Sequence, residues 1–190
     1  MTIIGVGCGP GMLTQEAIQE ISNSKLIYGS RRAVDIVREF IPPDCEVRGI
    51  DDYSKVSELP RDAVVLSTGD PMLAGLGFPG ARVVPGVSSM QVAFARLGLP
   101  LARAAVVVAH GNGHDKASGD VVEELRRGKI VFIITDPGFD VKSLAKHLGP
   151  DCRIAICEDL GYVSERISIG TAVSPPEAQS RLFSIVAWRQ

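Results

Sequence analysis

The 190-residue sequence contains few aromatic residues and almost no excess of charge of either sign. Phe, Trp and Tyr make up 5% of the chain, so the side chains on which single-stranded nucleic acid stacks are scarce. Lys and Arg number 20 against 22 Asp and Glu, which gives a net charge of −2. The isoelectric point of about 5.9 lies well below the ~9 that is typical of nucleic-acid-binding domains. We therefore expect no nucleic-acid partner.

Cysteine is also scarce, and the sequence has no long hydrophobic run. The four cysteines form no CxxC pair and are too few for a disulfide scaffold; they are Cys8, Cys45, Cys152 and Cys157. Gly, Pro or Ser interrupts every apolar run before the ~18 residues that a membrane span requires. The first residues, MTIIGVGCGP, lack the basic region of a signal peptide. These absences predict a cytoplasmic protein without a membrane partner, whose cysteines pack as small apolar side chains.

Glycine and proline, by contrast, are abundant, with 20 and 12 residues. Short β-branched runs alternate with amphipathic stretches, a pattern that predicts βαβ units and a parallel sheet. The predicted strands are Thr2–Val6, Leu26–Tyr28, Glu46–Ile50, Ala63–Thr68, Ala81–Val84, Ala104–Ala109, Lys129–Ile134 and Arg153–Cys157. The predicted helices are Leu13–Ile21 with Thr14 as its N-cap, Ser30–Phe40, Ser88–Leu97, Asp120–Arg127 and Asp140–Leu148.

A break in this pattern at Leu97–Arg103, where glycine and proline interrupt the chain, predicts a domain boundary. We predict an N-terminal parallel α/β domain over residues 1–100 and a C-terminal α/β domain over residues 101–190. In the second, the alternating runs Ser164–Thr171 and Arg181–Ala187 have no helix between them, which predicts an antiparallel edge and a mixed sheet. The predicted fold class is therefore α/β, built from two α/β domains.

Four glycine-rich loops follow predicted strands, at residues 5–11, 68–71, 85–89 and 110–114. Ligands of open α/β sheets bind outside the carboxyl ends of the strands, and glycine lets the backbone approach a ligand closely. Each loop taken alone can equally be a tight turn. The four loops together favour a ligand site.

The commonest nucleotide-binding motifs do not fit these loops. Gly5 and Gly7 match the start of the dinucleotide fingerprint GxGxxG, but Pro10 stands where its last glycine belongs. The second predicted strand ends in LIYG, without the acidic residue that would hold a ribose hydroxyl. No GxxxxGK[ST] sequence is present. These departures argue against an NAD site, against the commonest methyltransferase fold and against a P-loop.

The order GxGxGPG, then TGDP, then PGVSS resembles the tetrapyrrole methylase family. The resemblance implies a two-domain α/β fold that binds S-adenosylmethionine in a cleft between the domains, and a homodimer. Residues 28–32, 69–73 and 85–91 and the HG step after a strand are similar to the branch that methylates carbon 5 of a cobalt-precorrin in cobalamin biosynthesis. Another precorrin methyltransferase, a uroporphyrinogen-III methyltransferase, a diphthine synthase and a non-catalytic ligand-binding relative stay open as alternatives.

The resemblance also implies which residues touch the cofactor: Pro10, Gly69, Asp70, Leu73, Ser88, Ser89, Thr135, Asp136 and Leu160. Some of these residues have a structural alternative. A Gly-Asp-Pro turn can satisfy its own carboxylate as an Asx turn, and a serine that precedes a helix can cap it. Arg31 and Arg32 begin a predicted helix, where they either pair with carboxylates of the tetrapyrrole substrate or form a solvated helix start.

Two histidines remain, His110 and His114, four residues apart. That spacing binds metal on a helix, but Gly111 and Gly113 lie between them and no Cys or acidic residue completes a ligand set. We expect no metal. The sulfonium methyl donor is already reactive, so a base is needed at most for a later proton loss. His110 is the candidate for that base or for a substrate contact.

Overall fold

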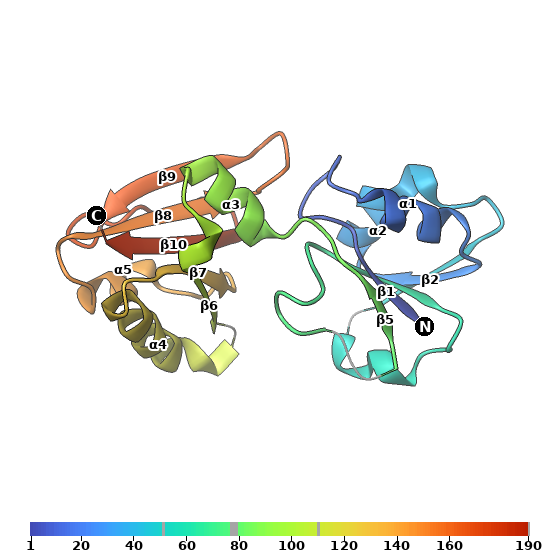
Figure 1. The fold of residues 1–190 in the computed structure, drawn as a ribbon, viewed down its shortest axis with the longest axis horizontal. Coiled ribbons are helices and arrows are strands. Elements are labelled where there is room, and N and C mark those ends of the chain that lie inside the picture. The colour runs from blue at the N-terminus through green and yellow to red at the C-terminus, as the bar shows by residue number, and fades with distance from the viewer. Residues whose placement is uncertain (51, 77–79, 110, 190) are drawn as a thin grey trace. The chain divides into compact units, whose positions relative to one another are not determined.

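The computed structural model describes residues 1–50, 52–76, 80–109 and 111–189. The chain divides into two compact units, Met1–Ser89 and Met90–Gln190 (Figure 1). This division falls at the start of helix α3 (Ser89–Leu97), whereas the boundary predicted from the sequence stands just after that helix. Each unit contains one five-stranded sheet.

The sheet of the first unit is parallel throughout, as the βαβ pattern predicts. Its order is β3-β2-β4-β1-β5. The strands are β1 (Thr2–Gly5), β2 (Leu26–Gly29), β3 (Glu46–Gly49), β4 (Val64–Ser67) and β5 (Arg82–Val84). The helices are α1 (Gln15–Ser22), α2 (Arg31–Val37) and the 3-10 turns η1 (Arg38–Phe40) and η2 (Tyr53–Glu58).

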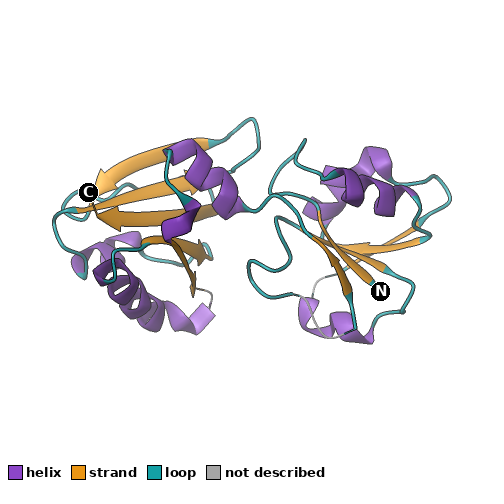
Figure 2. Ribbon diagram, viewed as in Figure 1, coloured by secondary structure: helices purple, strands orange, loops and turns teal. Residues whose placement is uncertain are grey.

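Both faces of this sheet are covered, because successive strand side chains point to opposite faces. Ile4 and Leu66 pack in one cluster with the buried sides of α1 and α2. Ile3 and Val65 pack in another with Val56 of η2. Figure 2 shows these helical segments on the two sides of the strands. The continuous apolar strands in the sequence are therefore buried on both faces.

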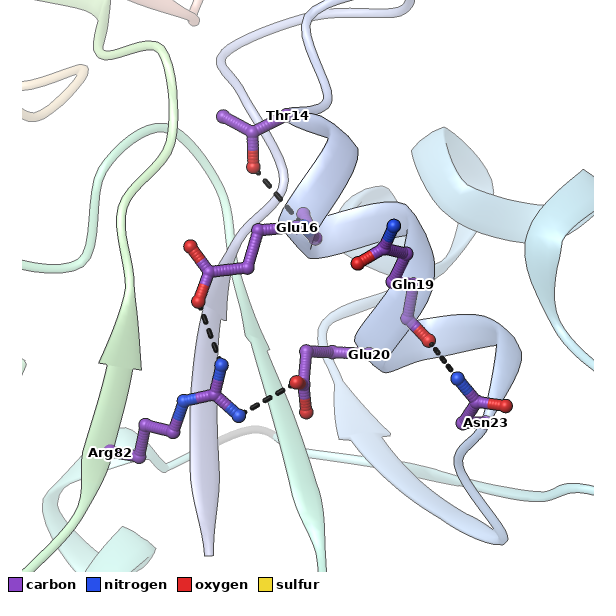
Figure 3. Close-up of polar contacts among 7 residues, drawn as sticks. Thr14, Glu16, Gln19, Glu20, Asn23 and Arg82 are labelled. Carbon is purple, nitrogen blue, oxygen red and sulfur yellow. Dashed lines mark hydrogen bonds and ion pairs between the residues drawn. The ribbon is translucent and has the colours of Figure 1, made fainter.

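Helix α1 illustrates how local sequence builds this unit (Figure 3). The Oγ1 of Thr14 accepts a hydrogen bond from the Ala17 N–H at 3.1 Å, so the predicted N-cap is confirmed. Glu16 and Glu20, one turn apart on the exposed side, both contact the guanidinium of Arg82 in β5, at 2.7 and 2.6 Å. These ion pairs connect the helix to the edge strand of the sheet.

The second unit has a mixed sheet of order β6-β7-β10-β8-β9. The pair β6–β7 is parallel, and the other pairs are antiparallel, so the predicted antiparallel edge is confirmed. The strands are β6 (Ala104–Ala109), β7 (Ile130–Thr135), β8 (Cys152–Glu158), β9 (Arg166–Thr171) and β10 (Phe183–Arg189). The helices are α3, α4 (His114–Arg126), α5 (Val141–Lys146) and the 3-10 turns η3 (Leu101–Arg103) and η4 (Gly111–Gly113).

Helix α4 begins at His114, so the predicted start at Asp120 is wrong. Ala117, Val121 and Leu125 recur every four residues and are all buried. This apolar stripe packs in one core cluster with the strands of the sheet. The glycine-rich loop that precedes α4 therefore ends earlier than the sequence suggested.

Strand β6 is apolar throughout, yet it is an edge strand whose Val106 and Val108 are 40% and 51% exposed. The expectation that the cysteines are buried is confirmed for two of the four. Cys152 is buried, as is Cys157, where burial raises the pKa of the thiol to about 12. Cys8 and Cys45 are only half-buried. None of the helices in the described ranges is long and apolar enough to span a bilayer.

Candidate functional site

The three glycine-rich loops of the first unit meet at the carboxyl edge of β4, β1 and β5. Gly5 ends β1, Gly69 follows β4 and Gly86 follows β5. A Cβ added to Gly86 would lie 2.3 Å from the Gly69 carbonyl oxygen and 2.7 Å from the Gly5 carbonyl carbon. A Cβ on Gly5 would lie 2.5 Å from the Gly86 nitrogen. Only glycine permits these three backbone segments to touch, and we call them the glycine junction.

Backbone hydrogen bonds hold the junction together. The Gly69 N–H donates to the Gly7 carbonyl at 2.8 Å, and the Gly7 N–H donates back to the Gly69 carbonyl at 3.3 Å. The Cys8 N–H donates to the Val87 carbonyl at 3.0 Å. Gly7 and Gly69 both have positive φ, at 79° and 75°. The loops that the sequence identifies as separate motifs thus form one structure.

Asp70 links two of these loops through its carboxylate. Its Oδ1 accepts the Met72 N–H at 2.8 Å, which is the Asx turn that the sequence left open as an alternative. Its Oδ2 accepts the Gly86 N–H at 3.0 Å. Asp70 therefore positions the loop after β4 against the loop after β5.

The other candidate residues of the first unit lie close to the junction in the chain. Pro10 is exposed and Ser88 is buried. Leu73 is half-buried, and its N–H donates to the Asp70 carbonyl at 3.2 Å. Ser89 is the first residue of α3. Pro10 therefore lies in the first loop, Leu73 two residues after the second loop, and Ser88 and Ser89 at the end of the third.

Arg31 and Arg32, at the start of α2, differ in their surroundings. The Nη2 of Arg32 donates to the Oγ1 of Thr68 at 2.8 Å, so this side chain reaches the loop that carries Gly69. The side chain of Arg31 is 97% exposed, and its Nε lies 4.0 Å from Asp35. Arg32 therefore supports the loop, and Arg31 presents its guanidinium to solvent.

In the second unit, Asp136 follows β7 and binds several groups at once. Its Oδ2 accepts the Gly111 N–H at 2.7 Å and lies 3.0 Å from the Nε2 of His114. Its Oδ1 accepts the Gly138 N–H at 2.8 Å. The bond to His114, followed by the two amides, lowers the pKa of this carboxyl from 3.8 to about 2. The neighbouring Thr135 donates its hydroxyl to the Phe183 carbonyl at 2.8 Å.

The end of β8 carries a second carboxylate with several partners. Glu158 is 1% exposed. Its Oε1 accepts the N–H groups of Gln179 and Ser180, at 2.5 and 2.6 Å, and its Oε2 pairs with Arg166. Asp159 has a positive φ of 47° and accepts the Ser180 hydroxyl at 2.7 Å. These bonds hold the start of the loop that contains Leu160, whose side chain is buried.

Several site contacts were not anticipated from the sequence. The sequence weighed His114 only as a metal partner of His110, and His110 lies outside the described residues. The hydrogen bond between His114 and Asp136 joins residues 22 positions apart, and nothing local indicates it. The positions of Gly5 at the end of one strand and Gly86 shortly after another were the available signal for the junction. Across the ranges that the structure describes, no group of three or more His, Cys, Asp or Glu side chains could hold a metal.

Comparisons with known proteins agree with this architecture. A structure of a precorrin-6Y methylase from Archaeoglobus fulgidus superposes with a TM-score of 0.79 at 29% identity, over 100% of this chain and 98% of that one. A Methanocaldococcus jannaschii protein named "Probable cobalt-precorrin-7 C(5)-methyltransferase" is 28% identical over 86% of both chains.

A Sinorhizobium protein named precorrin-6Y C(5,15)-methyltransferase [decarboxylating] is 28% identical over 88% of this chain but only 44% of its own length. The family model of tetrapyrrole (corrin/porphyrin) methylases matches residues 1–174. The order of the loops, their meeting at one sheet edge and this match lead to one conclusion: the chain belongs to the tetrapyrrole methylase family.

Proposed function

We propose that this chain is a methyltransferase that moves a methyl group from S-adenosylmethionine to carbon 5 of a cobalt-precorrin ring in cobalamin biosynthesis. The observation that carries the proposal is the glycine junction, in which three loops of the family's order meet at the carboxyl edge of one parallel sheet. That edge is where open α/β folds bind ligands. The relatives named for methylation of the C5 position support the choice of ring carbon.

The junction also fits the proposed cofactor. A Cβ added to Gly69 would meet only the Ser88 Cα, at 3.9 Å, and one added to Gly11 would meet nothing within 4 Å. The backbone is therefore open on those sides to a bound group, while the other sides of the junction are closely packed. The cofactor supplies an electrophilic methyl on a sulfonium, so the protein is required to orient the reactants and exclude water.

Each candidate residue then has a defined task. We assign contacts with the cofactor to Pro10, Gly69, Asp70, Leu73, Ser88, Ser89, Thr135, Asp136 and Leu160. Asp70 acts chiefly by holding the loop geometry, because both of its oxygens already accept backbone amides. Arg31, with its exposed guanidinium, pairs with ring carboxylates in the bidentate way that arginine favours. Arg32 holds Thr68 beside the cofactor loop.

Calorimetric measurement of S-adenosylhomocysteine binding tests the cofactor assignment. Wild-type protein binds it, and Asp70→Asn binds about tenfold more weakly, because one lost hydrogen bond of about 1.4 kcal/mol corresponds to that factor. Asp62→Asn is the matched control, since Asp62 is exposed and precedes the opposite end of β4. Absence of binding by the wild type contradicts the proposal.

Methyl transfer is tested by incubating the protein with S-adenosylmethionine and cobalt-precorrin-7, with mass spectrometry of the products. The expected result is one methyl group gained by the tetrapyrrole and an equal amount of S-adenosylhomocysteine. Cofactor binding without a methylated product would instead support a non-catalytic relative. The homodimer and the cytoplasmic location stay predictions, to be tested by sedimentation and fractionation.

A further inference from the structure

A histidine and an aspartate form a close pair at the carboxyl edge of the second unit's sheet. His114 is the first residue of α4, and Asp136 directly follows β7. The strands β6 and β7 that lead to them are the parallel pair of this sheet. The pair therefore lies at the kind of edge where α/β proteins place reactive groups.

The surroundings of Asp136 define the protonation of the pair. Its carboxylate accepts the N–H groups of Gly111 and Gly138 and contacts His114. These partners keep its pKa at about 2, so at neutral pH the carboxylate is ionised and can only accept. The Nε2 of His114 must therefore carry the hydrogen, and the lone pair of a neutral imidazole is then on Nδ1.

The imidazole ring is held in place on its other sides. Phe139 packs against it in a T-shaped contact, with ring centroids 5.3 Å apart at 71°. A Cβ added to Gly138 would lie 3.8 Å from the His114 Cε1, so the loop after β7 also lies beside the ring. The side chain nevertheless keeps 31% of its surface exposed. A ring with a defined tautomer, restrained orientation and an accessible edge has the properties of a general base.

We propose that His114, oriented by Asp136, is the proton acceptor of the methyl transfer; this rests on the proposed function. The electron pair of the ring carbon forms the new carbon–carbon bond, and the carbon–sulfur bond breaks with its pair left on sulfur. The proton on the methylated carbon then moves to Nδ1 of His114, and its electron pair returns to the tetrapyrrole. The imidazolium so formed faces the Asp136 carboxylate, which stabilises its charge.

The tautomer is tested on the protein alone by ¹⁵N NMR of the histidine rings. Wild-type His114 shows a protonated Nε2 and an unprotonated Nδ1 at neutral pH, and Asp136→Asn loses this preference. The resonances of His114 are those missing from the spectrum of His114→Gln. His147→Ala is the control that leaves the pair undisturbed, because His147 contacts only the Ser143 carbonyl, at 2.9 Å, among the hydrogen bonds of the described residues. A protonated Nδ1 in the wild type overturns the proposal whether or not methyl transfer is observed.

Kinetics separate a base from a structural contact. His114→Gln can still donate to Asp136 but offers no basic nitrogen, so kcat falls by about 100-fold with little change in KM. Added imidazole restores part of the turnover of His114→Ala. His147→Ala keeps wild-type kinetics. An unchanged kcat for His114→Gln, or a rise in KM alone, overturns the proposal and identifies a substrate contact. Failure of the wild type itself to form methylated product contradicts the proposed function instead.

Discussion

The two units hold their loops at the sheet edge by different chemistry. In the first unit, Gly5, Gly69 and Gly86 touch backbone to backbone. In the second unit, the carboxylates of Asp136 and Glu158 each accept two backbone N–H groups from loops. The first arrangement depends on the absence of side chains, and the second depends on a charge. The two edges should therefore respond differently to added volume and to lost charge.

The largest expected effect is that of Gly86→Ala. The new methyl would lie 2.3 Å from the Gly69 carbonyl oxygen, so the loops of the junction must move apart, which lowers the free energy of unfolding by about 3 kcal/mol. We expect faster amide hydrogen exchange at Gly7 and Gly69 and loss of S-adenosylhomocysteine binding. Urea unfolding, exchange mass spectrometry and calorimetry measure the three effects in turn.

Gly49→Ala is the control for this substitution. Gly49 ends β3 in the same sheet, is exposed, and an added Cβ there would meet nothing within 4 Å. Its stability and ligand binding should match those of the wild type. If Gly86→Ala proves as stable as the wild type, the loops of the junction accommodate the added methyl group. The contrast between the two units would then be contradicted.

An intermediate effect is expected for Glu158→Ala. The substitution leaves the N–H groups of Gln179 and Ser180 without their acceptor and Arg166 without its ion pair. Loss of these hydrogen bonds to a charged group costs about 2 kcal/mol of the free energy of unfolding. Glu158→Gln keeps an acceptor oxygen and should recover much of this loss in urea unfolding. Equal destabilisation by both substitutions would indicate that the charge, rather than the acceptor, holds the loop.

The smallest expected effect is the loss of stability when Asp136 is protonated at low pH. Its pKa in the folded state is about 2, below the ordinary 3.8, so its stabilising contribution is fully present above pH 3.8. It is lost as the pH falls towards 2, because the folded carboxylate must then take up a proton. The difference in urea midpoint between wild type and Asp136→Asn should narrow over this range. A difference that stays constant down to pH 2 would contradict the assigned charge.

Local patterns predicted much of the fold, and their failures are instructive. The cap at Thr14 and the parallel direction of the strands in the first sheet follow from residue types and spacing. The start of α4 at His114 was missed because glycine and polar residues concealed its buried stripe. The exposure of Val108 in β6 could not be inferred from the sequence, because an apolar run is the same in sequence whether its strand is central or at an edge.

The same distinction between local and long-range features applies to the candidate site. The candidate loops could be predicted because glycine and proline are conspicuous after a strand. The pairing of Asp136 with His114 could not, since it joins two separate loops.

The sequence by itself determined the α/β class, the glycine-rich loops and their family order, because periodicity and special backbone residues are local properties. Only the tertiary structure decided which loops touch and which carboxylates hold them. Gly5 meets Gly86, and His114 meets Asp136, across long stretches of chain. Such contacts depend on the order of strands in a sheet, and strand order is a property of the whole fold.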